Sequence, residues 1–306
     1  MADTGNKNIK IGIVGVGMVG APLKRYFEEF GGFLRGENLF LYDIDPGKEY
    51  EDDVNRADVI FISVPTPRLF DGACDSSEVD KTLARLATGK IAVIKSTVPP
   101  GTTIFFQEKY PHLNILCNPE FLTERTAWED TLRPDKQIVG FTDQSMDAAE
   151  LVLSLLPKAP FMSPSGKHTY QRIRLTATDA EMVKYGTNVY YARKVNFANV
   201  VAEIAEKVGA NYENVRMGLA ADFRIGDSHL DVDHGGYRGF GGYCLPKDLD
   251  ALIAHVDALG LVDCKALLTA DRKFNEDLLV SQGLTTAEVS THSDLLEQKL
   301  KSRKEK

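Results

Sequence analysis

The chain has 306 residues, of which 43% are hydrophobic and 26% are charged, and its formal net charge at pH 7 is -8. This length and composition are typical of a globular protein with room for two domains, and the acidic balance argues against a general binder of nucleic acid or of anionic membranes. The four cysteines and six histidines form neither a Cys-x-x-Cys pair nor a metal-ligand pattern, so we expect a reduced protein without a metal.

The first ten residues are polar and lack the apolar core of a secretory signal. No apolar run elsewhere in the sequence is long enough to span a bilayer. We therefore expect a cytoplasmic protein without a membrane partner.

The first half of the chain alternates short apolar runs with helix-like stretches. Several runs are rich in Val and Ile, as expected for strands buried on both faces. The alternation predicts βαβ units, and hence an α/β fold with a Rossmann-type, doubly wound parallel sheet over about residues 8–156. The predicted strands are Ile9–Val14, Leu39–Asp43, Val59–Val64, Ile91–Lys95, Ile115–Cys117 and Gln137–Phe141.

A glycine-rich loop, Gly15-Val-Gly-Met-Val-Gly20, follows the first predicted strand and precedes a predicted helix. Gly15 suits a tight turn, Gly17 leaves room for a pyrophosphate, and Gly20 allows close packing of helix on strand. Met18 and Val19 complete the loop at the helix N-terminus, which favours phosphate charge. In this context the pattern predicts a dinucleotide site.

Asp43 ends the second predicted strand, at the position where an acidic side chain accepts hydrogen bonds from the adenosine ribose. An acid there disfavours a 2′-phosphate, so the sequence predicts NAD rather than NADP. Asp45, two residues further on, is the alternative ribose ligand, and both could instead belong to a turn before Pro46.

Three loops follow later predicted strands and should reach the nicotinamide end of the site, because ligands bind at the carboxyl ends of strands in such sheets. Proline and glycine are also common in ordinary turns, which is the alternative interpretation. The loops are Val64–Pro67, Lys95–Gly101 and Asn118–Glu124.

The second half predicts a mainly helical domain, residues 175–275, built on one long helix. Thr178-Asp-Ala-Glu181 matches a capping box, the helical pattern continues to Lys207, and Gly209 is a natural stop. Shorter helices are predicted at Tyr212–Ala221 and from Pro246 to Gly260. Residues 276–306 are predicted to be a charged C-terminal tail.

Lys184 and Asn188 lie four residues apart on the long helix and therefore share a face. A cation beside an amide can stabilise a developing oxyanion. The alternative interpretation is an ordinary solvated helix face.

Cys244 lies in the segment Gly239-Phe-Gly-Gly-Tyr-Cys-Leu-Pro-Lys-Asp248. The glycines are expected to let backbone N–H groups gather around a ligand, and Pro246 suits the first turn of a helix. A cysteine at a helix N-terminus near Lys247 is expected to have a lowered pKa and to act as a nucleophile. The alternative is a buried, inert thiol.

Together these segments resemble the UDP-glucose/GDP-mannose dehydrogenase family, the nucleotide-sugar 6-dehydrogenases, over roughly residues 9–268. The element Cys244-Leu-Pro-Lys-Asp248 is the most specific part of the match. The other matching segments are Gly15–Gly20, Val64–Pro67, Ser96–Thr102, Asn118–Glu124, Glu181–Asn188 and Arg224–Gly226.

The resemblance implies a two-step oxidation of a C6 alcohol, UDP-glucose being the favoured substrate, to a carboxylate with two NAD consumed. Cys244 would add to the intermediate aldehyde, and the resulting thiohemiacetal would be oxidised to a thioester that water hydrolyses.

The resemblance also assigns roles to individual residues. Lys184 and Asn188 would stabilise the oxyanion and contact substrate, Asp248 would order a water or act as a base, and Glu124 with Thr97 would activate the hydrolytic water. The remaining cofactor contacts would be Thr66, Thr97, Glu124 and Lys247. The remaining substrate contacts would be Glu120, Phe121, Leu122, Arg224, Gly239, Phe240 and Gly241.

Family members carry a third domain, and the 35 residues after Asp271 are too few to form one. A separate chain could replace it. Two other functions stay open: a two-electron β-hydroxyacid dehydrogenase, which has no use for the thiol, and a non-catalytic NAD-binding subunit that needs a partner chain. The resemblance further implies a homodimer through the long helix, with Tyr190, Tyr191, Phe197 and Val200 as candidate contacts.

Overall fold

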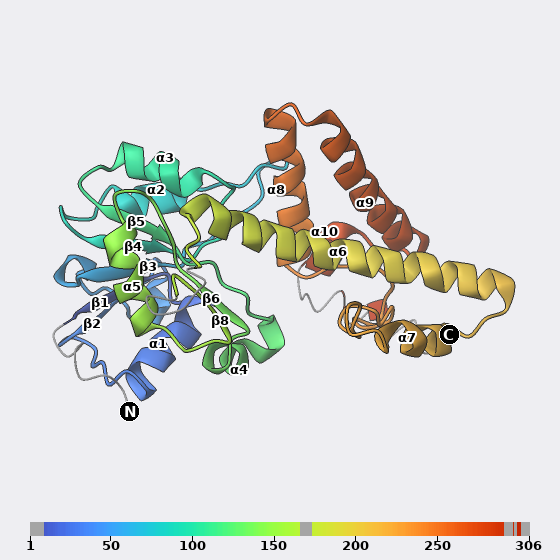
Figure 1. Cartoon of the computed structure of the whole chain (residues 1–306), viewed down its shortest axis with the longest axis horizontal. Coiled ribbons are helices and arrows are strands. Elements are labelled where there is room, and N and C mark those ends of the chain that lie inside the picture. The colour runs from blue at the N-terminus through green and yellow to red at the C-terminus, as the bar shows by residue number, and fades with distance from the viewer. Residues whose placement is uncertain (1–8, 166–172, 291–295, 297–298, 301–306) are drawn as a thin grey trace. The chain divides into compact units, whose positions relative to one another are not determined.

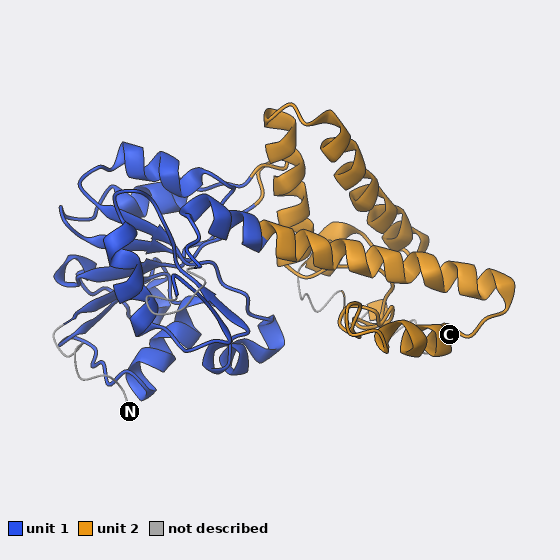
Figure 2. Cartoon of the chain, in the orientation of Figure 1, with its two compact units in different colours: residues 1–67, 74–184 blue, residues 68–73, 185–306 orange. Residues whose placement is uncertain are grey.

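The computed structural model describes residues 9–165, 173–290, 296 and 299–300. The chain divides into two compact units (Figure 2): unit 1 comprises residues 1–67 and 74–184, and unit 2 comprises residues 68–73 and 185–306. The division between units falls inside one continuous helix, α6 (Ala177–Val208). The domain limits expected from the sequence, at residues 156 and 175, stay predictions.

Unit 1 is built on a six-stranded sheet in the order β2-β1-β3-β4-β5-β7 (Figure 1). Its first five strands pair in parallel, and β7 is antiparallel to β5. The predicted Rossmann-type sheet is therefore confirmed, with an antiparallel edge strand added. The strands are β1 (Ile11–Val14), β2 (Leu39–Tyr42), β3 (Val59–Ile62), β4 (Ile91–Ile94), β5 (Asn114–Cys117) and β7 (Gly140–Phe141).

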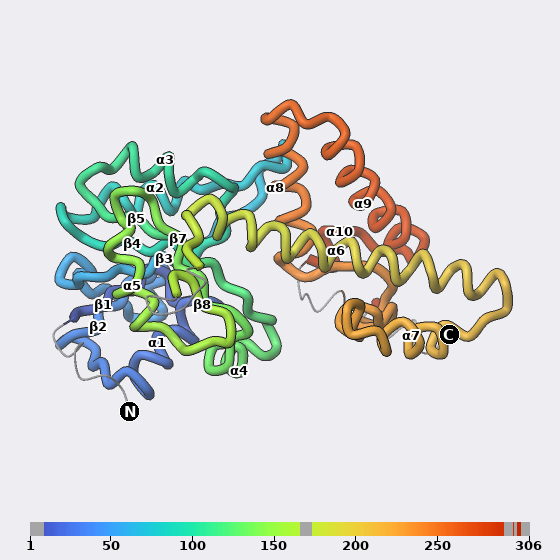
Figure 3. The backbone as a smooth tube through the Cα atoms, in the orientation of Figure 1, coloured from blue at the N-terminus to red at the C-terminus, as the bar shows by residue number. Residues whose placement is uncertain are grey.

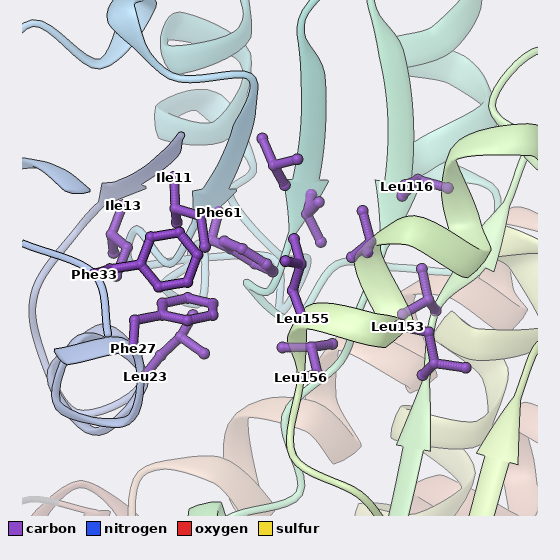
Figure 4. Close-up of a cluster of buried hydrophobic side chains, with 14 of the residues drawn as sticks. Ile11, Ile13, Leu23, Phe27, Phe33, Phe61, Leu116, Leu153, Leu155 and Leu156 are labelled. Carbon is purple, nitrogen blue, oxygen red and sulfur yellow. The ribbon is translucent and has the colours of Figure 1, made fainter. Parts of the chain in front are cut away.

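Helices cover both faces of this sheet, and the pleat explains the two layers because successive side chains point to opposite faces. Val59 and Phe61 of β3 belong to the core cluster that includes Phe27 and Leu153 (Figure 4). Ile60 of β3 belongs to the opposite cluster. The helices and turns of unit 1 are α1 (Gly20–Glu29), η2 (Pro46–Lys48), η3 (Val54–Arg56), α2 (Ser77–Leu83), α3 (Thr102–Lys109), η4 (Glu124–Thr126), α4 (Ala127–Leu132) and α5 (Met146–Leu155).

The single strand predicted over Gln137–Phe141 is wrong, because the chain changes sheets there. Strand β6 (Lys136–Ile138) pairs with β8 (Phe161–Ser163) in a separate parallel pair, and only β7 joins the main sheet. Gly140 permits the change, since a Cβ at this position would lie 2.6 Å from the carbonyl oxygen of Thr176.

Unit 2 is helical. It contains α6 from Tyr185 onward, α7 (Tyr212–Ala220), α8 (Cys244–Ala258), α9 (Val262–Ser281) and α10 (Thr286–Ser290). The backbone passes from α8 to α9 through a short connection, and the two helices contact each other (Figure 3). The predicted long helix and the helix after Asn211 are confirmed within two residues at each end.

The sequence did not predict α9 or α10, and residues 276–290 do not form the expected charged tail. They complete α9, form α10 and bury Leu279, Leu284 and Val289 against Tyr237. Short polar stretches separate these apolar positions, so the helical pattern of apolar residues was not evident in the sequence. The last part of the predicted tail, residues 301–306, lies outside the described residues.

In the described ranges 9–165 and 173–290, none of the helices has both the length and the apolar character that crossing a bilayer would require.

Candidate active site

The glycine loop of unit 1 has the conformation that its sequence predicts. Gly15 adopts a φ of 87°, and a Cβ there would lie 2.6 Å from the carbonyl oxygen of Ser63. A Cβ at Gly20 would collide with the Gly15 carbonyl, whereas a Cβ at Gly17 would meet no heavy atom within 4 Å. The loop is thus tightly packed at its ends and open at its centre, which suits a pyrophosphate at the start of α1.

Asp43 connects the end of β2 to this loop. Its buried carboxylate accepts hydrogen bonds from the backbone N–H of Val16 at 2.7 Å and of Asp45 at 3.0 Å, and from Lys48 Nζ at 2.9 Å. Although burial favours the neutral acid, these donors lower the pKa of Asp43 below its ordinary value. The side chain of Asp45 instead accepts from Gly47 N–H and caps η2. The geometry therefore favours Asp43 as the ribose ligand.

A surface cleft of about 460 Å³ lies beside this corner and is lined in part by Val16 and Lys48. The other lining residues are Ala21, Lys24, Arg25, Glu28 and Tyr50, and Lys24 forms an ion pair with Glu28 at 2.7 Å. The cleft therefore combines cationic, acidic and aromatic side chains.

The loops after β3 and β4 are joined by hydrogen bonds. The buried Thr66 hydroxyl donates to the carbonyl oxygen of Thr97 at 2.8 Å, and the Ser96 hydroxyl donates to that of Val64 at 2.7 Å. Thr66 and Thr97, both predicted cofactor contacts, are thereby brought together at the carboxyl end of the sheet.

Glu120 and Lys184 form a buried ion pair in unit 1. Lys184 Nζ lies 2.8 Å from Glu120 Oε1, and Glu120 Oε2 accepts from the N–H of Leu122 at 2.7 Å. Burial alone would raise the pKa of Glu120, but the charge of Lys184 and these hydrogen bonds lower it. The ring of Phe121 lies 5.7 Å from Lys184 Nζ and 4.2 Å from Lys136 Nζ, so it contacts two cations.

Lys95 is a buried cation that the sequence did not single out. Its Nζ donates to Asn118 Oδ1 at 2.8 Å, and Asn118 Nδ2 donates to the carbonyl of Ile138 at 2.7 Å. Burial lowers the pKa of Lys95 to about 8. The sequence feature that could have predicted its burial is its place directly after an apolar strand, because neighbouring strands of a parallel sheet enclose such a position.

Glu124 is exposed and begins η4, four residues after the buried Glu120. The structure therefore gives the two glutamates different surroundings, with only Glu120 in the ion pair.

The predicted capping box at Thr178 and Glu181 is wrong. Thr176 and Asp179 cap α6, because the Asp179 carboxylate accepts from Thr176 N–H and Asp179 N–H donates to the Thr176 hydroxyl. Glu181 faces α3 instead and accepts from Gly101 N–H at 2.6 Å, Thr103 N–H at 2.8 Å and the Thr103 hydroxyl at 2.6 Å. It supplies the cap that Gly101 cannot provide.

In unit 2, the fully buried carboxylate of Asp248 binds two predicted site residues. Asn188 Nδ2 donates to Asp248 Oδ2 at 2.6 Å, and Lys247 Nζ donates to Asp248 Oδ1 at 2.6 Å. Cys244 is half-buried and is the first residue of α8, four residues before Asp248 and hence on the same helix face.

In the segment before Cys244, the N–H groups of Arg238, Phe240 and Gly242 donate to protein acceptors. For the N–H groups of Gly239 and Gly241, the expected role in ligand binding stays a prediction. The Phe240 side chain, a predicted substrate contact, packs in the core of unit 2 beside Leu249. Position 241 requires a glycine, because a Cβ there would collide with the hydroxyl of Tyr237.

Arg224, another predicted substrate contact, is exposed and pairs with Asp222 at 2.5 Å. Within unit 2 the structure does not bring it to Cys244. Across the described part of the chain, no three His, Cys, Asp or Glu side chains are grouped closely enough to hold a metal ion.

Comparison with known proteins gives matches in both halves of the chain. The family model described as UDP-glucose/GDP-mannose dehydrogenase family, NAD binding domain, matches residues 44–155, and that of the family's central domain matches residues 178–277. The matched segments include Lys184, Asn188 and Cys244.

Two curated relatives are UDP-glucose 6-dehydrogenases. The protein from Rickettsia typhi is 35% identical over 226 residues, which cover 71% of this chain and 49% of the relative. The protein from Rhizobium meliloti is 34% identical over 257 residues, covering 78% and 56%. The chain thus spans about half the length of the curated relatives it matches.

Among solved structures, a UDP-glucose dehydrogenase from Pyrobaculum islandicum aligns with a TM-score of 0.76 at 27% identity, covering 92% of this chain and 71% of that one. A UDP-D-ManNAc dehydrogenase from Pyrococcus horikoshii, at 21% identity and a TM-score of 0.71, shares the fold.

Proposed function

Because the chain belongs to the UDP-glucose/GDP-mannose dehydrogenase family, we propose that it catalyses the NAD-dependent oxidation of the C6 alcohol of a nucleotide sugar to a carboxylate. UDP-glucose is the proposed substrate, since the curated relatives described above carry that name. The observation that carries the proposal is the arrangement on α8, where Cys244 opens the helix and Asp248 holds Asn188 and Lys247.

NAD fits the residues of unit 1. The open space at Gly17 admits a pyrophosphate, the start of α1 faces it, and the ionised Asp43 can accept from ribose hydroxyls. When bound, NAD would supply the hydride acceptor for each of two oxidations. The loops that carry Thr66 and Thr97 would lie beside its nicotinamide end.

The protein's own groups would carry the rest of the reaction. The first oxidation removes a hydride and a proton from the alcohol and leaves an aldehyde. The sulfur of Cys244 then forms a bond to the aldehyde carbon, giving a thiohemiacetal whose oxygen Lys184 and Asn188 would stabilise. Loss of a second hydride together with the hydroxyl proton gives a thioester, and water cleaves its C–S bond to release the carboxylate and regenerate the thiol.

Three carboxylates have proposed parts in the proton transfers. Asn188 and Lys247 fix the position of the two carboxylate oxygens of Asp248. From this position Asp248 would order a water or accept a proton. Glu124, assisted by Thr97, would activate the hydrolytic water. Glu120 would contact substrate or water while its charge is balanced by Lys184.

We also propose a homodimer through α6, which exposes large apolar side chains at regular spacing. Tyr190 is 58% exposed, Phe197 56% and Ile204 57%, and the seven-residue intervals place all three on one face. Tyr191 was also a candidate contact from the sequence, together with Tyr190 and Phe197. Its ring instead stacks on that of His229, with the ring centroids 4.2 Å apart.

The test is product stoichiometry with UDP-glucose and NAD. We expect two NADH per sugar, no acid product from Cys244→Ser, and normal turnover from Cys264→Ser, which removes an exposed thiol. One NADH per substrate would support a two-electron dehydrogenase instead. NAD binding without turnover, relieved by adding a partner chain, would support a non-catalytic subunit.

A further inference from the structure

The segment before Cys244 is held by side chains of α9 through paired hydrogen bonds. Gln282 Oε1 accepts from Arg238 N–H at 2.9 Å, and Gln282 Nε2 donates to the Arg238 carbonyl at 2.8 Å. Asn275 Oδ1 accepts from Phe240 N–H at 2.7 Å, and Asn275 Nδ2 donates to the Phe240 carbonyl at 3.0 Å. Gly242 N–H then donates to the carbonyl of Val289 at 2.8 Å.

These bonds reproduce one edge of an antiparallel β ladder. In such a ladder, every second residue of a strand exchanges both its N–H and its C=O with the partner. Here the partner of residues 238 and 240 is not a strand but two amide side chains, that of Asn275 on α9 and that of Gln282, the C-cap residue of this helix. An amide suits this pairing because it carries a donor and an acceptor in one planar, uncharged group.

The arrangement is buried and sterically specified. Asn275 is 1% exposed. Gly239 adopts a φ of 106°, and a Cβ there would lie 2.7 Å from Asn275 Oδ1, so a side chain at this position would displace the amide. The glycine loop is therefore shaped to receive Asn275.

The same segment is fixed to α6 by its side chains. Arg238 Nε donates to Asn199 Oδ1 at 2.9 Å, and Arg238 Nη2 donates to the Asn199 carbonyl at 3.1 Å. The Phe240 ring packs beside Val189 and Ala192 of α6. The backbone and the side chains of this segment are thus bound to two different helices. Only Tyr243 separates the last fixed residue, Gly242, from Cys244.

We propose that Asn275 and Gln282 are positioning residues, which hold the segment 238–242 so that Cys244 is fixed at the first turn of α8. The importance of this position for catalysis rests on the function proposed above. The structural claim does not: removing the amides should free the segment and loosen the first turn of α8, which begins at Cys244, whether or not the thiol reacts with a sugar aldehyde.

The experiment compares Asn275→Leu with Asn196→Leu. Asn196 is a matched control because it is also a buried asparagine, 4% exposed, and it donates to the carbonyl of Asp271 on α9 without touching residues 238–242. Two properties are measured: amide hydrogen exchange of the peptide containing residues 238–244, and the pH dependence of Cys244 alkylation by iodoacetamide. The exposed Cys264 serves as the internal reference for alkylation.

In Asn275→Leu we expect exchange of these amides to accelerate about tenfold or more, and the pH dependence of Cys244 alkylation to differ from that of the wild type, because the surroundings of the thiol change. Asn196→Leu should change neither. Asn275→Leu also removes a buried group from α9, so a milder variant is needed. Gln282→Leu, at the half-exposed C-cap of this helix, should change both properties in the same direction.

Exchange and alkylation that match the wild type in both amide variants would overturn the positioning proposal. An equal change in Asn196→Leu would overturn it as well, because the effect would then reflect loosening of unit 2 in general. Failure of the proposed function gives a different result: the wild type would produce no NADH from a nucleotide sugar, while the effects of Asn275→Leu on segment 238–244 persisted.

Discussion

Lys184 on α6 and Glu120 after β5 form an ion pair from which water is almost completely excluded, with Nζ and Oε1 2.8 Å apart and side chains 4% and 8% exposed. The residues are 64 positions apart in the sequence, and their pairing has two consequences. It attaches the beginning of α6 to the carboxyl edge of the sheet. It also means that neither charge is solvated if its partner is removed.

Replacing Lys184 with methionine should therefore destabilise the protein as well as impair any reaction. We expect the free energy of unfolding to fall by about 3–5 kcal/mol, because the Glu120 carboxylate would be left buried and unpaired. Urea denaturation measures the loss. The double variant Lys184→Met, Glu120→Gln should recover part of it, since no unpaired charge remains.

The control for this experiment is Lys24→Met. Lys24 pairs with Glu28 one turn away on α1, where both side chains are more exposed, and its loss should cost no more than about 0.5 kcal/mol. A comparable cost for the two lysines would contradict the importance given to burial of the Glu120 pair.

Asp43→Asn should weaken NADH binding by about 10- to 100-fold, the value of a hydrogen bond to a charged group. The substitution removes the carboxylate that can accept from the ribose and replaces one acceptor with a donor facing Val16 or Asp45 N–H. Quenching or enhancement of NADH fluorescence on titration gives the dissociation constant. Asp45→Asn is the matched control, and a larger effect there would make Asp45 the ribose ligand.

Much of unit 1 could be predicted because strand burial and glycine geometry are local properties. The Val- and Ile-rich runs predicted β1 to β5, and the loop from Gly15 to Gly20 has the shape its sequence indicates. The error at residues 137–141 arose because a switch between sheets depends on what packs against Gly140, which lies far away in the sequence.

The polar partners could not be predicted, since hydrogen bonds between distant elements leave no periodic signal. Glu181 was assigned to its own helix, but the structure pairs it with Gly101 and Thr103. Asn275 and Gln282 carried no signal at all, because the helix that presents them was not predicted. The sequence thus singled out chemically distinctive candidates such as Cys244, whose role stays a prediction, but not the groups that hold them.

The dimer proposal predicts that Ile204→Asp yields a monomer. An aspartate in place of Ile204, the last residue of the exposed apolar row on α6, would have to be desolvated at the interface. Sedimentation velocity, at a concentration where the wild type is dimeric, measures the change. Lys81→Asp, a charge change on an exposed residue of α2, should leave the dimer intact. A wild-type protein that is monomeric would contradict the proposal directly.

Glu181 should make stability depend on pH in an unusual direction. Burial raises the pKa of Glu181 from the ordinary glutamate value of 4.5 to about 7, in spite of its three hydrogen bonds to Gly101 and Thr103. Between these values the folded state binds more protons than the unfolded state, so this group's contribution to stability is fully present below pH 4.5 and is lost as the pH rises through 7.

Over that interval the contribution should change by about 3 kcal/mol, since each pKa unit corresponds to about 1.4 kcal/mol. Position 181 cannot titrate in Glu181→Gln. The unfolding free energy of the wild type minus that of the variant should therefore decrease as the pH rises from 4.5 to 7.5. Urea denaturation at several pH values measures it, with Glu203→Gln on the exposed part of α6 as the reference substitution. If wild type and Glu181→Gln instead gave parallel curves, the Glu181 carboxylate would be ionised throughout, and its hydrogen bonds to the start of α3 would outweigh the cost of burying its charge.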